Sequence, residues 1–249
     1  MSRFFVSLSY NGKNYVGWQI QPNGMSVQQI LQDKLSTLLR DTIEIVGAGR
    51  TDAGVHAHKM IAHFDWGGEP FSLTDLMFKL NRFLPPDIAI LKIRKVRPDA
   101  HARFSALSRT YRYYITHKKD PFHGEMKHRI SFDMDVDEMN SLSTVLKDYT
   151  DFTSFSRLHS DAKTNICHIE NAYWEKCGDE YRFTITANRF LRNMVRAIVG
   201  TLLEAPKGRL DIDRLRNIIE AKDRSQAGNS APAHALFLHD VTYPNDIWL

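Results

Sequence analysis

One aspartate and one arginine stand in a run of small residues at positions 47–57, which includes three glycines. Glycine allows the backbone to approach a ligand closely or to adopt a positive φ, so such a run suits the wall of a cleft better than a packed core. Asp52 follows a segment with the pattern of a strand and is poorly placed for core packing. This carboxylate, with Arg50 close by, is therefore the first candidate for chemistry.

The glycine spacing excludes two common nucleotide-binding loops. Gly47, Gly49 and Gly54 lack the third glycine of the dinucleotide fingerprint, and no Gly-Lys-Ser/Thr ending of a phosphate-binding loop follows them. Local chemistry alone leaves two interpretations. The run is either a catalytic loop or a turn between strands in which an aspartate caps its own backbone.

The composition is that of a globular protein with a core, because 43% of the residues are hydrophobic and 25% are charged. A chain of 249 residues forms one large domain or two modest ones. No apolar stretch has the length of a membrane span, and the only cysteines, Cys167 and Cys177, indicate free thiols in a cytoplasmic protein. The net charge of +4 is compatible with a polyanionic partner without establishing one.

The first half of the chain alternates between strand and helix patterns. Ser26 opens one helix, with Gln29 in the capping-box position, and Ser72 opens another that Pro85 and Pro86 end. The expected strands are residues 3–10, 42–46, 59–65 and 88–96. The order strand, helix, strand, strand, helix, strand is that of the split βαβ, ferredoxin-like arrangement.

The second half repeats this order with longer insertions. Its expected elements are a strand at 109–117, a helix at 135–148, strands at 166–176 and 181–187, helices at 190–204 and 212–221, and a closing strand at 235–243. We therefore predict an α+β protein with two ferredoxin-like, RRM-like βαββαβ halves that meet near residues 97–108. Their antiparallel sheets are expected to be joined around a central cleft, where a ligand would bind.

Three arginines have helical spacing at the expected helix 190–204. Arg189, Arg192 and Arg196 stand at i, i+3 and i+7, opposite an apolar stripe. The row is either the ordinary solvated face of an amphipathic helix or a set of guanidinium groups that faces phosphates or a carboxylate. Both interpretations stay open on spacing alone.

Aromatic and basic residues also mix on the expected strand 109–117. Alternation places Arg109, Tyr111 and Tyr113 on one face. Aromatic rings beside basic groups stack on splayed-out bases, and tyrosines also pack routinely in half-buried strands. The pattern is compatible with either role.

Residue spacing argues against metal and serine-type chemistry. His56, His58 and His63 match no familiar zinc pattern and have no cysteine near them in sequence. Cys167 and His168 form an isolated pair, and the sequence has no Gly-x-Ser-x-Gly elbow. The features that remain for chemistry are one aspartate, several arginines and tyrosines, and a duplicated α+β scaffold.

Residues 47–57 resemble the signature Gly-Arg-Thr-Asp-Ala-Gly-Val-His of the tRNA pseudouridine synthase A family. The resemblance extends over nearly the whole chain, with further blocks in the family order. These blocks are Tyr10-Asn11-Gly12, Tyr15-x-Gly17-Trp18-Gln19-x-Gln21-Pro22, Ser26-Val27-Gln28, Ala102-Arg103-Phe104-Ser105-Ala106, Arg112-Tyr113, Asp151-Phe152-Thr153-Ser154-Phe155, Phe190-x-x-x-Met194-Val195-Arg196-x-Ile198-x-Gly200 and Ala231-Pro232-Ala233-His234.

The resemblance implies an enzyme that isomerises uridine to pseudouridine in tRNA and uses no cofactor and no metal. The family modifies the 3′ side of the anticodon stem and loop, at tRNA positions 38, 39 and 40. It acts in the cytoplasm as a homodimer, with the tRNA lying across both subunits and no membrane involved. The implied fold is that of pseudouridine synthases, with an N-terminal half at 1–104 that carries the catalytic aspartate and a C-terminal half at 105–249.

The resemblance also assigns roles to matching positions. Asp52 matches the catalytic aspartate, which acts as a nucleophile or stabilises positive charge and abstracts a proton. Tyr111 matches the tyrosine that packs on the target base, and Arg196 the basic residue that pairs with the aspartate and keeps it ionised. Arg50 matches the residue that helps to displace the base from its stack. Leu236 matches the apolar contact to the base.

The chain departs from the family pattern near its end. The family usually has glycine at the position of Ala235 and a basic residue at that of Asn229. The absence of a basic residue at Asn229 argues against an RNA contact there. Ala235 precedes Leu236 and affects the loop that is expected to contact the base. Two other functions stay open. One is a non-catalytic RNA-binding module on RRM-like sheets. The other is a phosphotransfer or glycoside enzyme that uses Asp52, for which no phosphate loop or second acidic residue in a matching context is found.

Overall fold

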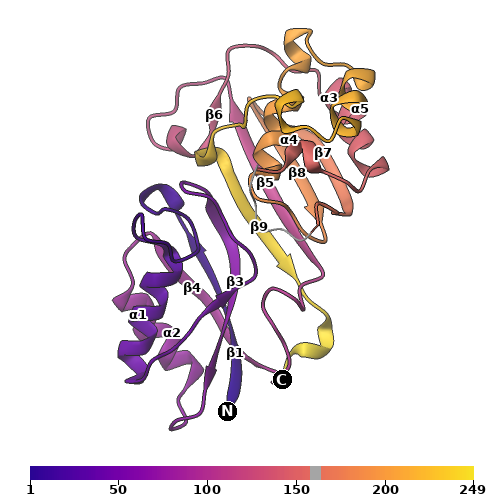
Figure 1. Cartoon of the computed structure of the whole chain (residues 1–249). Helices are drawn as coiled ribbons and strands as arrows, with labels where there is room; N and C mark the ends of the chain where they lie inside the picture. The colour runs from indigo at the N-terminus through magenta and orange to yellow at the C-terminus, as the bar shows by residue number, and fades with distance from the viewer. Residues whose placement is uncertain (158–163) are drawn as a thin grey trace. The chain divides into compact units, whose positions relative to one another are not determined.

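The computed structural model describes residues 1–157 and 164–249. The chain divides into two compact units, one formed by Met1–Leu107 with Leu238–Leu249 and the other by Ser108–Phe237 (Figure 1). Both units combine strands with helices, and five α-helices occur in the described residues, which confirms the mixed α and β class. In this described part no helix has the length and apolar character needed to cross a membrane.

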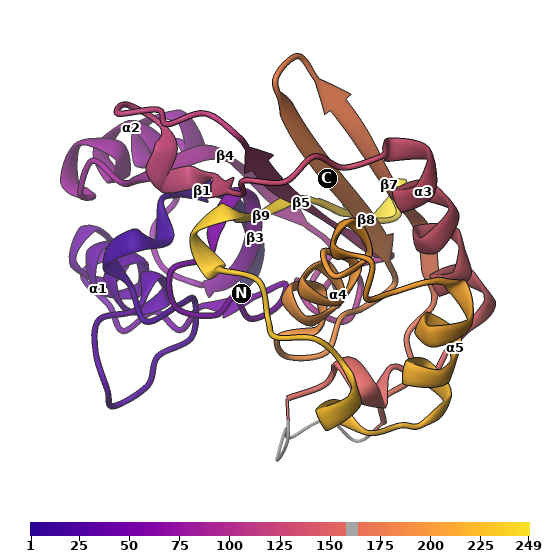
Figure 2. The same ribbon diagram turned by 90° about the horizontal axis from the view of Figure 1, so that it is seen from above.

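The first unit is a sheet with two helices on one face (Figures 1 and 2). Its elements are β1 (Ser2–Tyr10), α1 (Val27–Leu39), β2 (Val46–Gly47), β3 (His56–Trp66), α2 (Leu73–Phe83), β4 (Ile88–Val96) and, from Leu238 onward, β9 (Leu236–Thr242). β1 pairs antiparallel with both β3 and β4, and β9 lies on the far side of β3. Phe4 of β1 stacks on Phe64 of β3 with ring centroids 5.4 Å apart, and Phe71, which precedes α2, packs on Phe4. These rings join the sheet to its helical layer.

The C-terminal segment belongs to the first unit, whereas the sequence analysis placed it in the second half. β9 pairs with β3, and the Leu107 amide donates to the Thr242 carbonyl at 2.9 Å. Further along, the Arg97 amide donates to the Ile247 carbonyl at 3.0 Å. Through these backbone contacts the C-terminal segment returns to the unit in which the chain starts.

Both helices of the first unit begin at the predicted serines. Ser26 Oγ accepts a hydrogen bond from the Gln29 amide at 3.2 Å, and Ser72 Oγ accepts one from the Asp75 amide at 3.2 Å. Each bond satisfies an amide that has no partner within the helix. α2 ends at Phe83, shortly before the two prolines that the sequence identified as its end.

The expected strand at 42–46 is wrong, because only Val46–Gly47 forms a strand, β2, beside β3. Side chains of α1 instead bind the backbone of Ile45, the residue just before β2. Gln32 Oε1 accepts from the Ile45 amide at 3.2 Å, and Gln28 Nε2 donates to the Ile45 carbonyl at 2.7 Å. Since these backbone groups are bonded to a helix, they do not form a strand ladder.

The second unit is built around an antiparallel sheet in which β8 lies between β5 and β7. Its elements are β5 (Ser108–Thr116), β6 (His128–Arg129), α3 (Val136–Val145), β7 (Ile169–Cys177), β8 (Glu180–Ala187), α4 (Met194–Leu202) and α5 (Ile212–Glu220). α3 is joined to β7 by Asn140, which accepts from the Trp174 amide at 2.7 Å and donates to its carbonyl at 3.1 Å. Tyr181, Phe183 and Ile185 of β8 are buried, as the alternation predicts.

The expected helix at 190–204 starts later than predicted, because α4 begins at Met194. Asn193 adopts the left-handed conformation with φ 66°, which interrupts a helix, and its Nδ2 donates to Ser230 Oγ at 2.6 Å. Arg189 and Arg192 therefore precede the helix. The predicted row of three arginines on one helical face is wrong, and Arg196 alone of the three lies on α4.

His63 of β3 ties the sheet to the segment after β4. Its Nδ1 accepts from the Ala102 amide at 3.1 Å, and burial, assisted by the positive charge of Arg3, lowers its pKa to about 4. The ring is thus held neutral in the folded protein. The unfolded chain would take up a proton near the ordinary histidine pKa of about 6.5.

We expect this difference to destabilise the fold as the pH falls from about 6.5 to about 4, by roughly 3 kcal/mol at most. Chemical denaturation of the wild type and His63→Asn at about pH 7 and about pH 4.5 would measure it. The variant should lose less stability on acidification than the wild type. His123→Asn, at an exposed histidine, is the control. Equal acid sensitivity of all three proteins would contradict this account of His63.

Gln28 links two segments on either side of α1. Its Oε1 accepts from the Ile20 amide at 3.1 Å, and its Nε2 donates to the Ile45 carbonyl. Gln28→Ala should lower the free energy of unfolding by about 1–3 kcal/mol, because two hydrogen bonds are lost. Gln29→Ala is the matched control, since the Gln29 side chain makes no hydrogen bond with the described residues. Equal urea midpoints for the two variants would contradict the linking role.

Candidate active site

The loop between β2 and β3, which carries Arg50 and Asp52, is held by the segment that follows β1. The Trp18 amide donates to the Thr51 carbonyl at 3.2 Å. The Tyr10 hydroxyl is hydrogen-bonded to Thr51 Oγ1 at 2.8 Å, and Thr51 itself is buried. Two sequence blocks that are separated along the chain therefore form one structure around the aspartate.

Glycines in this segment let the two backbones touch. A Cβ on Gly17 would lie 2.3 Å from the Thr51 carbonyl oxygen, and Gly17 also has a φ of 109°. A Cβ on Gly12 would lie 2.0 Å from the Val55 carbonyl oxygen. Both distances are far shorter than a van der Waals contact. The glycine of the signature at position 49 differs, because a Cβ there meets no atom within 4 Å.

Asp52 is half-buried, between the buried Thr51 and the exposed Ala53. Its carbonyl oxygen accepts from the Val55 amide at 3.1 Å, which closes a tight turn, and Gly54 within that turn has a φ of 77°. Backbone groups therefore form this turn. Arg50, two residues earlier in the same loop, is exposed.

The three histidines near this loop occupy separate positions. His56 is buried and its Nδ1 accepts from the Gly12 amide at 3.0 Å. His58 contacts His239 of β9, with their Nδ1 atoms 3.3 Å apart, while His63 binds the Ala102 amide. Among the residues that the structure describes, no three histidine, cysteine or acidic side chains are grouped as metal ligands. His56 instead fixes the start of β3.

Tyr111 is held on β5 of the second unit by a neighbouring ring. It lies opposite Ile185 of β8 and is half-buried. The Phe190 ring meets it edge to face, with centroids 5.2 Å apart and planes at 88°. This geometry is favourable for aromatic pairs and restricts the plane of the tyrosine. Phe190 stands in one of the motifs that carry the family resemblance, but its spacing before Met194 does not predict this contact.

Arg196 of α4 makes two hydrogen bonds to Ala231, in the segment that precedes β9. Its Nε donates to the Ala231 carbonyl at 2.7 Å, and its own carbonyl accepts from the Ala231 amide at 2.9 Å. Tyr113 is fully buried on β5 and its hydroxyl donates to the Pro232 carbonyl at 3.0 Å. Burial raises the pKa of Tyr113, so its hydroxyl stays protonated and donates even in the alkaline range.

The two departures from the family pattern, Asn229 and Ala235, fit their surroundings without backbone strain. A Cβ on Gly200 of α4 would lie 1.8 Å from the Asn229 carbonyl oxygen, so the loop lies directly against the helix. Beside it, Arg224 Nη2 donates to Ser230 Oγ at 3.0 Å, a contact that sequence reasoning did not find. Ala235 is fully buried and its φ is not positive, so its methyl group fits without backbone strain.

The site residues expected from the sequence therefore lie in two groups. Arg50 and Asp52 share one loop of the first unit. Tyr111, Arg196 and Leu236 belong to the second unit, where Leu236 is buried at the start of β9. In each group, hydrogen bonds or ring contacts to segments remote in sequence position the local backbone.

Known proteins match this chain over residues of both units. The sequence profile of the tRNA pseudouridine synthase family matches residues 7–105 and 149–244. The tRNA pseudouridine synthase A of Parabacteroides distasonis is 61% identical over 248 residues, which cover 100% of this chain and 98% of the relative. That of Bacteroides thetaiotaomicron is 55% identical over 251 residues, with 100% and 93% covered. That of Bacillus subtilis is 36% identical over 249 residues, with 98% and 100% covered.

Gly17→Ala should displace the loop that carries Asp52, because the new methyl group meets the Thr51 carbonyl and the positive φ is unfavourable for alanine. We expect a fall in melting temperature of several degrees, corresponding to at least about 1 kcal/mol. Gly49→Ala is the matched control in the same loop and should melt close to the wild type. Differential scanning calorimetry would compare them, and equal melting temperatures would contradict the steric argument.

Proposed function

The chain belongs to the tRNA pseudouridine synthase family, and on that basis we propose that it converts uridine into pseudouridine in the anticodon arm of tRNA. One observation carries the proposal. The Arg50-Thr51-Asp52 block and the family's amino-terminal block match in sequence and also bind each other, through Trp18 and Tyr10, in the first unit. A glycine-rich turn that only connected two strands would not need hydrogen bonds from a segment remote in sequence.

Asp52 is the proposed nucleophile. Its carboxylate attacks the anomeric carbon of the ribose, and the bond from that carbon to N1 of the uracil breaks. The base turns, and C5 forms the new bond to the ribose as the carboxylate leaves. The proton on C5 is lost and N1 carries a proton in the product. The reaction is an isomerisation and consumes no oxidant, reductant or co-substrate.

For Tyr111, Arg196, Arg50 and Leu236 we propose the roles that the family resemblance implies. The edge contact with Phe190 gives the Tyr111 ring a defined plane, which suits packing on a uracil. Arg196 is the proposed basic partner of the aspartate, and the bond from its Nε to the Ala231 carbonyl holds its guanidinium group. The exposed Arg50 is suited to taking the place of a base that leaves its stack.

The fold supports this proposal at a finer level. The first unit has the order β1, α1, β2, β3, α2, β4, and its sheet order is β4, β1, β3, β9 with β2 also beside β3. We propose that this unit, with the N-terminal half at 1–104, is ferredoxin-like. We propose the same ferredoxin-like, RRM-like arrangement for the C-terminal half at 105–249. We further propose a cytoplasmic homodimer with the tRNA lying across both subunits, as the family resemblance implies.

Asp52→Asn should abolish pseudouridine formation, because the amide is not a nucleophile at the ribose carbon. The assay is the release of tritium from tRNA labelled at C5 of uridine. Asp41→Asn is the matched control, since Asp41 lies in the exposed turn before β2 and only caps the Thr42 amide. Wild-type release by Asp52→Asn would overturn the assignment. Absence of release by the wild type would favour a non-catalytic RNA-binding module.

A further inference from the structure

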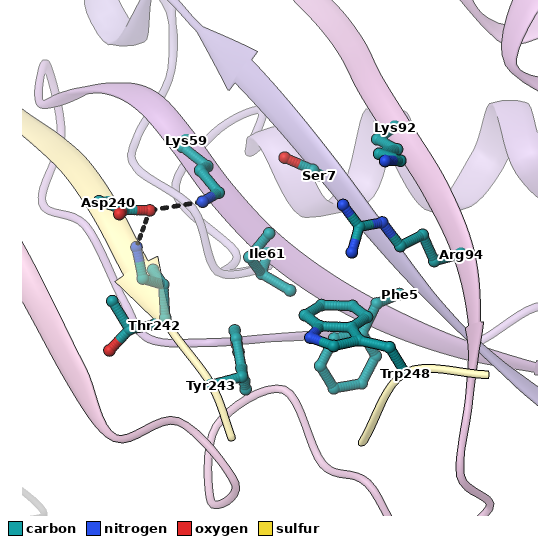
Figure 3. Close-up of a pocket in the computed structure, with 11 residues that line it drawn as sticks. Phe5, Ser7, Lys59, Ile61, Lys92, Arg94, Asp240, Thr242, Tyr243 and Trp248 are labelled. Carbon is teal, nitrogen blue, oxygen red and sulfur yellow. Dashed lines mark hydrogen bonds and ion pairs between the residues drawn. The ribbon is translucent and has the colours of Figure 1, made fainter. Parts of the chain in front are cut away.

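A pocket of about 310 Å³ lies in the first unit, on the face of its sheet opposite α1 and α2, above Phe5, Ser7 and Ile61 of β1 and β3 (Figure 3). Phe5 and Ser7 alternate with Phe4, whose ring packs with the helical layer, so they belong to the other face. The pocket contains none of the residues assigned to the reaction.

The C-terminal segment builds the aromatic side of this pocket. Trp248 forms a bridge to Val96 of β4, and its ring meets Phe5 edge to face, with centroids 5.8 Å apart. Tyr243 also contacts Phe5, with centroids 5.1 Å apart. Figure 3 shows Trp248 and Tyr243 extending over the sheet from the C-terminal segment. These contacts give the pocket an aromatic wall with a fixed geometry.

Cationic groups from β3 and β4 line the rest. Lys59 Nζ is 2.6 Å from Asp240 Oδ1, and the Arg94 guanidinium lies 4.7 Å from the centroid of Trp248. Lys92 is exposed and makes no hydrogen bond or ion pair with the described residues. Asp240 supplies the sole carboxylate among the lining residues. The pocket therefore carries a net positive charge beside its aromatic wall.

This chemistry suits one nucleotide of an RNA strand. Lysine and arginine bind phosphate, and the arginine fork is well matched to its oxygens. Aromatic rings beside such cations stack on bases and sugars. Since a strand rises about 3.3 Å per residue, Lys59 lies roughly 10 Å along β3 from His56, at the start of the strand that follows the Asp52 loop. A long RNA substrate extends well beyond this distance.

We propose that this pocket binds a nucleotide of the tRNA other than the uridine that is modified, with Lys92 and Arg94 on its phosphate. The proposal rests on the proposed function only in taking tRNA as the substrate. Lys92 does not take part in the reaction, so its role is in affinity. Substitution of Lys92 should therefore raise the KM for tRNA and leave kcat unchanged.

The test compares two charge reversals on the same strand. Lys92→Glu changes a residue opposite Ser7, on the pocket face, and Lys95→Glu changes an exposed residue opposite Phe4, on the other face. The change in net charge is identical. We expect Lys92→Glu to weaken tRNA binding about tenfold and to reduce the salt dependence by about one phosphate contact, as measured by fluorescence anisotropy. Lys95→Glu should weaken it less than about twofold.

Three outcomes would overturn the proposal. One is an equal loss of tRNA affinity in both variants. Another is that uridine 5′-monophosphate binds the wild type in a Lys92-dependent way while tRNA affinity does not depend on Lys92. The third is that Lys92→Glu changes the oligomeric state in analytical ultracentrifugation with unchanged tRNA affinity, which would assign the face to a second copy of the chain. Failure of the proposed function shows separately, as a wild type that releases no tritium.

Discussion

Close contact between two stretches of backbone determines where the loop that carries Asp52 lies. Gly12 and Gly17 leave no room for a Cβ against the carbonyl oxygens of Val55 and Thr51. The amino-terminal segment therefore lies directly on the loop, and the amide of Trp18 is close enough to bind the Thr51 carbonyl. The position of Asp52 thus follows from its backbone and its neighbours. Contacts to the backbone on both sides of Asp52 therefore define where its side chain starts.

The same means of support recurs elsewhere in the molecule. In the first unit, side chains of α1 bind the backbone on both sides of the helix, with Gln28 reaching Ile20 and Ile45. In the second unit, Arg196 holds Ala231 through both its side chain and its carbonyl. In each case a connecting segment is held by hydrogen bonds from a helix. Side-chain donors and acceptors here bind backbone N–H and C=O groups that would otherwise pair within a longer sheet.

Regular elements with strong periodicity could be predicted from the sequence. β4 has the bounds that were expected, and Ser26 caps α1 as its spacing to Gln29 indicated. The segment at 42–46 has the pattern of a strand, but no pattern reveals that a helix will bind its backbone first. The start of α4 was missed for a similar reason, because the left-handed Asn193 is held by Ser230, far along the chain.

The candidate site was predictable in its residue types but not in its supports. The aspartate was evident from the small residues around it and from a resemblance in the right order. Phe190 beside Tyr111 and Arg224 beside Ser230 were not, because both contacts join residues whose spacing has no periodic meaning. A motif points to the residues that are proposed to act on the substrate. The residues that hold them are distributed through the fold and become visible only when it is formed.

The contact between the C-terminal segment and β4 has a consequence for solubility. β4 is the outermost strand of its sheet, and the open edge of such a strand is a template for pairing with other chains. The Leu249 amide binds the Lys95 carbonyl, and the Ile247 carbonyl binds the Arg97 amide, so part of this edge is already occupied. The segment therefore protects the protein against edge-to-edge aggregation through β4.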